Sequence, residues 1–319
     1  MDIYRSDRQM VLVALGGNAL IRQGDTPDVS TQERNADEIV SRLMVLVERD
    51  FNLVVSHGNG PQVGNLLLRT DRTADVLPRM PLDVLVAETA GSMGYFLQQA
   101  FLNHMRHTEL RRYVVTVITQ VIVDANDPAF ARPSKPIGMH YDKQQAKQLQ
   151  QDLGWEMVHE GDRGWRRVVP SPRPLKIVQR HMIRHSVQEG NIVIACGGGG
   201  IPIMVNKDGN YEGVEAVIDK DLTSSMLASE TKADTLIILM PEPQVYVDFG
   251  TPRQRSLDRV NLSQTTDYLA EGHFPPGSIG PKVSAAIQFV QRGGRRAIIT
   301  NAENLTAALD GQAGTTIVP

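Results

Sequence analysis

Short apolar runs alternate with longer stretches of helical periodicity along most of this chain. The apolar runs are rich in Val and Ile and lie at residues 10–15, 53–55, 114–118, 192–195, 235–239 and 297–299. They are nearly continuous rather than alternating, as is typical of strands covered on both faces. Helical periodicity lies between them at residues 36–47, 84–105, 222–228 and 283–291. This alternation predicts a mainly parallel sheet with helices on both sides.

Two segments depart from this rhythm. Residues 124–174 are rich in Pro, Gly, Arg and Asp and have weak strand signals, so we interpret them as an insertion on the first half of the chain. We call this segment the lid. Residues 314–318 at the end of the chain, Gly-Thr-Thr-Ile-Val, predict a closing edge strand.

Composition narrows the class of protein. A chain of 319 residues with 41% hydrophobic and 22% charged residues has the composition of a globular protein, as one large domain or two joined lobes. The net charge of -3 predicts no nucleic-acid partner, and no apolar run is long enough to predict a membrane span. The polar residues 1–8 lack the apolar core of a secretion signal. A single cysteine, Cys196, cannot form an internal disulfide, which favours the cytoplasm.

Three of the predicted strands run directly into glycine-rich loops, at residues 15–19, 57–64 and 196–202. Glycine lets several backbone N–H groups point at one anion, helped by the positive end of a following helix. Each loop taken alone is better explained as a tight turn, because glycine turns are routine in α/β connections. Three such loops at strand ends in one chain favour an anion site, because the carboxyl ends of parallel strands meet at one edge.

Two common anion-binding motifs do not fit. No Gly-Lys pair occurs, which excludes a P-loop enzyme. Gly58, Gly60 and Gly64 are spaced one residue too long for a dinucleotide-binding fingerprint, which disfavours a dehydrogenase.

Lysine is scarce, and three of the eight lysines have distinctive neighbours. Lys135 is flanked by prolines, Lys220 lies between Asp219 and Asp221, and Lys282 follows Gly-Pro at the start of a helix. Phosphoryl transfer needs positive charge around the moving group, and the aspartates would orient the ammonium groups, a magnesium–nucleotide complex, or both. The alternative is surface ion pairing, which is worth little. The positions of Lys220 and Lys282 at helix starts favour function, whereas Lys135 fits both interpretations.

Other candidates favour structural roles. His57 at a strand end and Cys196 without a helper residue are interpreted as buried structural residues. No cluster of metal ligands occurs at a recognisable spacing.

Taken together, the motifs resemble those of carbamate kinases, in the amino acid kinase superfamily. The resemblance extends from about residue 10 to residue 318 and includes the lid motifs at residues 126–130, 135–138 and 164–169. The motifs outside the lid lie at residues 14–19, 57–64, 197–202, 216–222 and 280–283.

This resemblance implies a reaction and an architecture. The reaction is ATP plus carbamate giving ADP plus carbamoyl phosphate, with Mg²⁺ carried by the nucleotide and no metal-ligating residue of the chain's own. The architecture is a three-layer αβα sandwich with a small protruding subdomain, in a homodimer. Residues 10–190, including the lid, would form the acceptor lobe, and residues 191–319 the nucleotide-binding lobe.

The resemblance also implies roles for individual residues. The catalytic residues would be Lys135, Lys220, Asp221 and Lys282. The acceptor and the transferred phosphoryl group would be held by Gly16, Gly17, Asn18, Gly58, Asn59 and Gly60. The nucleotide would be held by Gly198, Gly199, Asp219, Lys220, Lys282 and Tyr246. Relatives that phosphorylate acetylglutamate, glutamate or aspartate have a lysine just before the first glycine pair; this chain has Leu15 there, and Lys135 would supply the charge.

One segment departs from the family pattern. Residues 240–243 read Met-Pro-Glu-Pro where the family usually has a Thr-Asp or Thr-Gly turn into the nucleotide site. The two prolines have no backbone N–H to donate, and the threonine hydroxyl that could serve the nucleotide is absent. Two alternatives therefore stay open: a subunit that binds carbamoyl phosphate or nucleotide without efficient catalysis and serves a transcarbamoylase, and a kinase for another small acceptor.

The apolar positions of residues 81–105 fit a helix buried by the core and by a partner subunit, or a more deeply buried helix in a monomer.

Overall fold

The computed structural model describes residues 8–17, 19–22, 24–275 and 279–319. Within these residues, an eight-stranded sheet forms the centre of the molecule, and all its neighbouring strands are parallel except the pair β16–β17. The strand order is β15 (Arg259–Asn261), β17 (Thr315–Val318), β16 (Arg296–Thr300), β12 (Thr235–Leu239), β1 (Met10–Leu15), β2 (Asn52–His57), β9 (Ile192–Ala195) and β3 (Val114–Val117).

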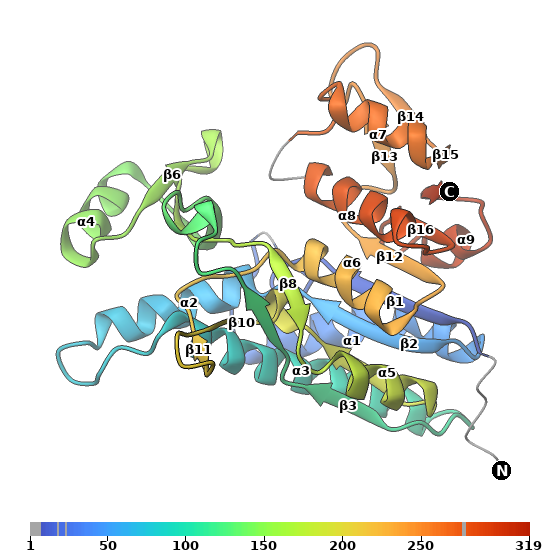
Figure 1. The fold of residues 1–319 in the computed structure, drawn as a ribbon, viewed down its shortest axis with the longest axis horizontal. Helices are drawn as coiled ribbons and strands as arrows, with labels where there is room; N and C mark the ends of the chain where they lie inside the picture. The colour runs from blue at the N-terminus through green and yellow to red at the C-terminus, as the bar shows by residue number, and fades with distance from the viewer. Residues whose placement is uncertain (1–7, 18, 23, 276–278) are drawn as a thin grey trace.

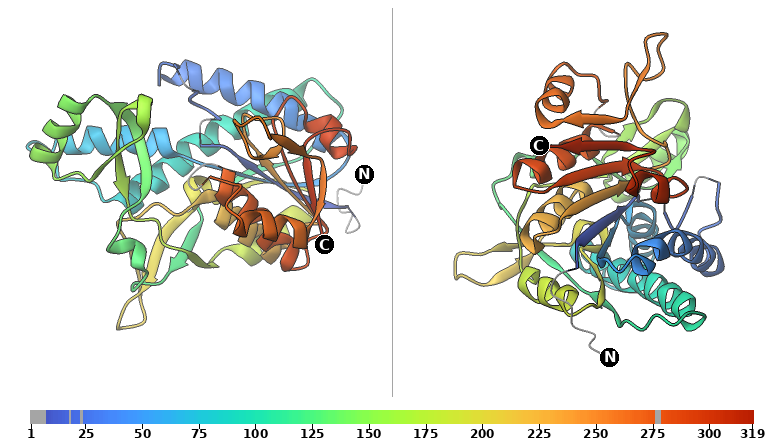
Figure 2. Two further views of the ribbon diagram at one scale, coloured as in Figure 1. Left: turned by 90° about the horizontal axis from the view of Figure 1, so that it is seen from above. Right: turned by 90° about the vertical axis from the view of Figure 1, so that its right-hand side faces the viewer.

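Helices cover both faces of this sheet, which gives the three layers (Figures 1 and 2). One layer contains α1 (Val29–Glu48), α3 (Leu82–Arg106) and α9 (Leu305–Leu309). The opposite layer contains α5 (Arg180–Gln188), α6 (Lys220–Thr231), α8 (Ile279–Gln291) and, farther out, α7 (Leu262–Ala270).

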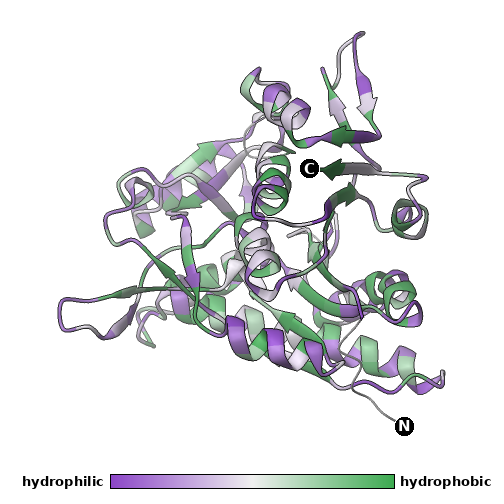
Figure 3. Ribbon diagram, turned by 45° about the vertical axis from the view of Figure 1, so that its right-hand side comes forward, coloured by the Kyte–Doolittle hydropathy of each residue, from purple (hydrophilic) through white to green (hydrophobic). Residues whose placement is uncertain are grey.

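Strand β1 shows why its apolar run is continuous. Met10, Leu12 and Ala14 pack into the core beneath α6 and α8, whereas Val11, Val13 and Leu15 pack into the core beneath α1 and α3. Successive side chains of a strand point to opposite faces, so a strand buried on both sides is apolar at every position. Figure 3 shows the hydrophobic colour concentrated on the central strands and on the inner sides of the helices.

The six predicted strands and four predicted helices are confirmed. Strands β1, β9 and β12 have the predicted bounds and β3 ends one residue earlier, whereas the other two strands and the four helices extend by one to several residues. The prediction of an edge strand at the C-terminus is wrong, because β17 lies between β16 and β15. The three-residue strand β15 pairs outside it, with buried Val260 between exposed Arg259 and Asn261. A strand this short gives too weak a periodicity to be recognised in the sequence.

The lid contains more strand than its sequence indicates. It folds into an antiparallel sheet of order β5 (Lys135–Tyr141), β7 (Trp165–Val169) and β6 (Met157–His159), with α4 (Lys143–Leu153) beside it. Two short 3₁₀ turns, η1 (Pro128–Phe130) and η2 (Gly161–Arg163), complete it. Figures 1 and 2 show this unit projecting from the body, beside α2 (Gly60–Arg72).

A second sheet joins the lid to the body. Its order is β11 (Tyr211–Gly213), β10 (Ile201–Val205), β4 (Gln120–Val123) and β8 (Pro174–Ile177), so the strands before and after the lid pair with each other. A small hairpin pairs β13 (Val245–Val247) with β14 (Arg255–Leu257). None of the helices in the described ranges combines the length and the apolar character needed to cross a membrane.

Candidate active site

The three glycine loops meet at the carboxyl edge of the sheet, after β1, β2 and β9. At several positions the loops are in such close contact that a side chain is excluded: a Cβ on Gly58 would lie 2.7 Å from the Cα of Gly17. Gly198 has a φ of 68° and packs on the side-chain amide of Asn59, where a Cβ would overlap it. That amide donates to Thr89 of α3 at 2.8 Å. Glycine is therefore required at these positions both for space and, at Gly198, for conformation.

Helix α6 begins at this edge and places two charged residues in its first turn. Asp219 caps the helix, and its Oδ1 accepts from the backbone N–H groups of Asp221 at 2.9 Å and Leu222 at 3.3 Å. This cap fixes the helix start and so directs Lys220 and Asp221 into the structure. Their side chains are only 8% and 5% exposed.

Asp221 lies between two ammonium groups. Lys220 Nζ is 2.7 Å from its Oδ1, and Lys282 Nζ, from the first turn of α8, donates to its Oδ2 at 3.3 Å. Burial alone would raise the pKa of Asp221, but the charges of Lys220 and Lys282 lower it below its usual value. Burial lowers the pKa of Lys220, and the charge of Asp221 opposes that effect. The carboxylate thus offsets part of the cost of burying the Lys220 ammonium group.

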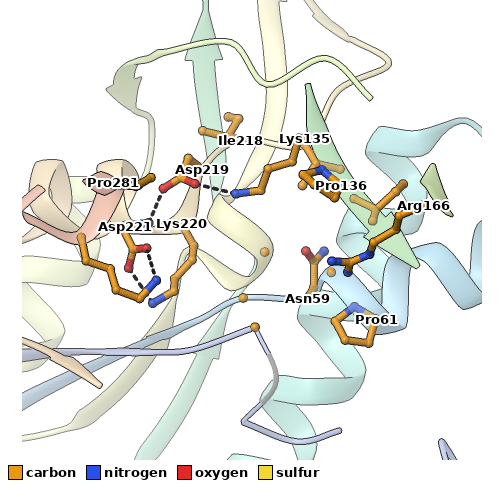
Figure 4. Close-up of a pocket in the computed structure, with 17 residues that line it drawn as sticks. Asn59, Pro61, Lys135, Pro136, Arg166, Ile218, Asp219, Lys220, Asp221 and Pro281 are labelled. Atoms are coloured by element: carbon orange, nitrogen blue, oxygen red, sulfur yellow. Dashed lines mark hydrogen bonds and ion pairs between the residues drawn. The ribbon is translucent and has the colours of Figure 1, made fainter. Parts of the chain in front are cut away.

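A third lysine approaches from the lid. Lys135 is the first residue of β5, and its Nζ donates to Asp219 Oδ2 at 2.5 Å. Figure 4 shows Lys135 reaching from the lid strand toward Asp219, with Lys220 and Asp221 on the far side of Asp219 from Lys135. Asp219 therefore connects the lid with the start of α6.

Arg166 of β7 is a further cation in the same site. Its Nε donates to the carbonyl of Gly138 at 2.9 Å, and a Cβ on Gly60 would lie 3.6 Å from its Nη2. Burial lowers the pKa of Arg166, and the Glu160 carboxylate 3.9 Å away opposes that effect. Figure 4 shows its guanidinium pointing toward Asn59. The sequence contains Arg166 in a recognised lid motif, but adjacent arginines in a strand do not reveal which one faces the site.

These groups line one cavity of about 180 Å³. Its charged lining consists of four cations, Lys135, Arg166, Lys220 and Lys282, against the carboxylates of Asp219 and Asp221, so an anion is favoured there. The predicted site residues that the cavity brings together are Gly17, Gly58, Asn59, Gly60, Lys135, Gly198, Asp219, Lys220, Asp221 and Lys282.

The other predicted site residues lie elsewhere. Gly16, Gly199 and Tyr246 are outside the lining of this cavity in the part of the chain that the structure describes. Gly199 packs beneath it, where a Cβ would overlap the Ile218 carbonyl, and the Tyr246 ring on β13 lies 5.7 Å from that of Phe249. Asn18 lies outside the described residues.

The two residues interpreted as structural are buried. Burial lowers the pKa of His57 to about 4, so its ring is neutral at pH 7, and its Nδ1 lies 3.1 Å from the Gly58 carbonyl. Burial raises the pKa of the Cys196 thiol, which keeps it protonated and unreactive. Cys196 is thus a small buried residue, as the sequence predicts. Among the described residues, no group of three or more His, Cys, Asp or Glu side chains is arranged to hold a metal ion.

The Met-Pro-Glu-Pro segment follows β12 and is tied to β16. The Met240 N–H donates to the Thr300 carbonyl at 2.9 Å, and the Thr300 hydroxyl donates to the Pro243 carbonyl at 3.0 Å. Within the described ranges, residues 240–243 do not line the cavity.

Comparison with known proteins agrees with this geometry. The model of the amino acid kinase family matches residues 9–301. A carbamate kinase of Thermococcus kodakarensis is 44% identical over 311 residues, which cover 97% of this chain and 98% of the relative. The structure of Giardia lamblia carbamate kinase bound to citric acid has a TM-score of 0.94 and 38% identity, and covers 98% of this chain and 99% of that one. The same enzyme bound to AMP-PNP has a TM-score of 0.89 and 39% identity, with the same coverage.

The three-layer fold and the lysine-rich cavity at its carboxyl edge define an enzyme, a kinase. The chain belongs to the amino acid kinase family and, within it, to the carbamate kinases.

Proposed function

We propose that this kinase transfers a phosphoryl group between ATP and carbamate, forming or consuming carbamoyl phosphate. The observation that carries the proposal is the convergence of Lys135, Lys220 and Lys282, from the lid, α6 and α8, on one cavity opposite the glycine loops. Phosphoryl transfer needs precise positioning and preorganised positive charge more than covalent help.

Each side of the cavity has its own task in this proposal. The backbone of Gly17 and of Gly58–Gly60, with the Asn59 amide, binds the acceptor and the phosphoryl oxygens. Lys220 and Lys282 stabilise the charge that develops between acceptor and nucleotide, and Asp221 keeps both ammonium groups in place. Lys135 and Arg166 close the acceptor side from the lid.

The size and charge of the cavity support a small acceptor. About 180 Å³ has to accept both the acceptor and the transferred phosphoryl group, which favours carbamate over an amino acid. The position before the first glycine pair is Leu15, which is fully buried and apolar, so acceptor-side charge comes from the lid. A kinase for another acceptor of similar size is the alternative within this class.

We propose Mg²⁺ as the divalent cation that an ATP-dependent kinase requires. The described residues fit a cation carried by the nucleotide, because Asp219 and Asp221 offer hard oxygen atoms and no three-residue cage accompanies them. When bound, Mg²⁺ neutralises charge on the β- and γ-phosphate oxygens. Gly198, Gly199 and Tyr246 are our proposed nucleotide contacts on the second lobe.

The direct test is ATP formation from ADP, Mg²⁺ and carbamoyl phosphate. Turnover by the parent chain that requires all three components supports the proposal. Acetyl phosphate in place of carbamoyl phosphate separates a carbamate kinase from a kinase for another small acceptor. A folded protein that gives no ATP with either donor contradicts the proposed activity.

A binding subunit is the second candidate, and the Met-Pro-Glu-Pro segment is the observation in its favour. Thermal stabilisation by carbamoyl phosphate or ADP without turnover would support it. A purified transcarbamoylase that then accepts carbamoyl phosphate from this chain faster than from solution would identify the partner.

We propose a homodimer in the cytoplasm with the acceptor lobe at residues 10–190 and the nucleotide lobe at residues 191–319. Strand β9 of the second segment lies between β2 and β3, so the two lobes would share one sheet.

Exposed apolar side chains for the proposed dimer contact gather on α3 and along the edge strand β3, namely Tyr95, Leu102, Tyr113, Val115 and Ile118. This surface suits a second copy. Leu102→Arg should halve the mass measured by light scattering, whereas Leu175→Arg, at another exposed leucine, should not.

A further inference from the structure

Asp71 is a buried carboxylate outside the active site. It lies in the last turn of α2, and its side chain is 8% exposed. Its Oδ2 accepts from Trp155 Nε1 at 2.7 Å and from Arg167 Nη1 at 3.2 Å, and its Oδ1 lies 3.5 Å from Arg79 Nε. A carboxylate is costly to bury unless it is paired and hydrogen-bonded. Two of these three partners come from the lid.

Trp155 and Arg167, the two lid residues of this contact, are themselves held by packing within the lid. Trp155 is 5% exposed, and the Arg167 guanidinium lies 4.4 Å from the centre of its ring. The Tyr141 ring packs against Trp155 edge-on at 6.2 Å. Asp71 thus binds a stacked pair that is itself packed into the lid, and a stacked guanidinium has little freedom to follow another acceptor.

Helix α2 connects this contact with the cavity. Its first residues, Gly60 and Pro61, line the cavity, and Asp71 lies about 16 Å farther along the helix. Midway, a Cβ on Gly64 would overlap the backbone of Gly138 in β5. One rigid helix therefore contacts the acceptor loop, the lid strand and the Trp155–Arg167 pair.

We propose that Asp71 is a positioning residue that holds the lid on α2 and thereby sets where Lys135 stands over the acceptor side of the cavity. The strand pairing transmits the contact: Arg167 of β7 lies opposite Ile137, and Lys135 lies opposite Val169 on the same two strands. A shift of Arg167 toward or away from Asp71 therefore moves Lys135 with it. Asp219, which Lys135 contacts, caps α6 and so belongs to the body rather than to the lid.

The kinetic test rests on the proposed function. Asp71→Ala should raise the KM for carbamoyl phosphate about ten- to a hundred-fold, because small displacements of a positioning group cost that much. The KM for ADP should stay within about twofold, because the Asp71 contact reaches the cavity through β5 and Lys135, which stand on the proposed acceptor side. Asp71→Asn, which keeps an acceptor for Trp155 but loses the charge for Arg167, should give an intermediate value. Asp75→Asn, at an exposed carboxylate four residues on, is the matched control.

A second test needs no activity. Both tryptophans of the chain, Trp155 and Trp165, lie in the lid, so a Trp165→Phe background reports on Trp155 alone. There, Asp71→Ala should shift the emission to the red and make it easier to quench with acrylamide, and Asp75→Asn should do neither.

The two tests separate the possible outcomes. A changed Trp155 signal with a raised KM for carbamoyl phosphate alone establishes the positioning role. An unchanged signal, or equal increases in both KM values, overturns it. If the parent chain has no kinase activity, the proposed function fails, and binding of carbamoyl phosphate measured by calorimetry with Asp71→Asn replaces the KM. Equal affinity of parent and variant would then overturn the positioning role.

Discussion

The two sides of the cavity hold their cations in different ways. On the body side, Lys220 and Asp221 are neighbours in one helical turn, more than 90% buried, and fixed by the Asp219 cap. On the lid side, the side chains of Lys135 and Arg166 are 27% and 17% exposed, and they stand on a small sheet that contacts the body through α2. The first arrangement is local and dry, whereas the second depends on contacts between distant parts of the chain.

This difference predicts different consequences of substitution. Charges that are buried and paired interact strongly, and the loss of one leaves its partner unsatisfied in a medium of low dielectric. Charges that water partly screens interact more weakly, and the lid-side cations stand at the proposed acceptor side rather than beside the transferring group. We therefore expect changes on the body side to reduce kcat and changes on the lid side to raise the KM for the acceptor.

The largest effect should follow loss of Lys220. Lys220→Ala should lower kcat for ATP formation by about a hundred- to a thousand-fold, because it removes a preorganised cation from the transferring group. Lys282→Ala should have a smaller effect, since its side chain is 20% exposed and its contact with Asp221 is longer. The control is Lys207→Ala, at an exposed lysine in the turn between β10 and β11. If Lys220→Ala keeps more than about a tenth of the parent rate, the body side does not carry the charge stabilisation proposed here.

The body side is also the part of the site that sequence reasoning recovers best. Each glycine loop and the Asp-Lys-Asp triplet are continuous in the sequence, so their chemistry is visible without a structure. Lys282 could be predicted as a site residue because it lies at a recognisable helix start. The recognition of strands follows the same rule: β1 and β12 are continuous apolar runs and were predicted, whereas the three-residue strand β15 was not.

The lid side was only partly predictable, because its organisation depends on residues far apart in sequence. Lys135 and Asp219 are 84 residues apart, and so are Asp71 and Trp155. Arg166 and Arg167 are adjacent in β7 and face opposite ways, one into the cavity and the other toward Asp71. The sequence alone does not reveal which of the two arginines faces the cavity and which faces Asp71.

A second prediction concerns Asp221 and pH. Burial lowers the pKa of Lys220, and Asp221 opposes that effect, so Asp221→Asn should lower this pKa further. Lys220 then loses its proton at a lower pH, and the alkaline limb of kcat against pH should move toward neutrality. At pH 7 we expect a loss of about ten- to a hundred-fold. Measuring kcat of the parent and of the variant over about four pH units, from about pH 6 to about pH 10, checks this. An alkaline limb that stays in place would show that Lys220 does not depend on Asp221 for its charge.

The smallest effect should come from Arg166, and it tests the lid side alone. Arg166→Met keeps the length of the stem but removes the charge, so the KM for carbamoyl phosphate should rise about tenfold with little change in kcat. Arg166→Lys restores the charge without the Nε bond to Gly138, and should recover part of the affinity. Arg163→Met, at a lid arginine whose side chain is 63% exposed, serves as the matched control. If Arg166→Met lowered kcat as much as Lys220→Ala does, the distinction between a dry body side and a screened lid side would fail. Arg166 would then act on the transferring phosphoryl group itself, since only a contact stronger in the transition state than in the bound substrate lowers kcat.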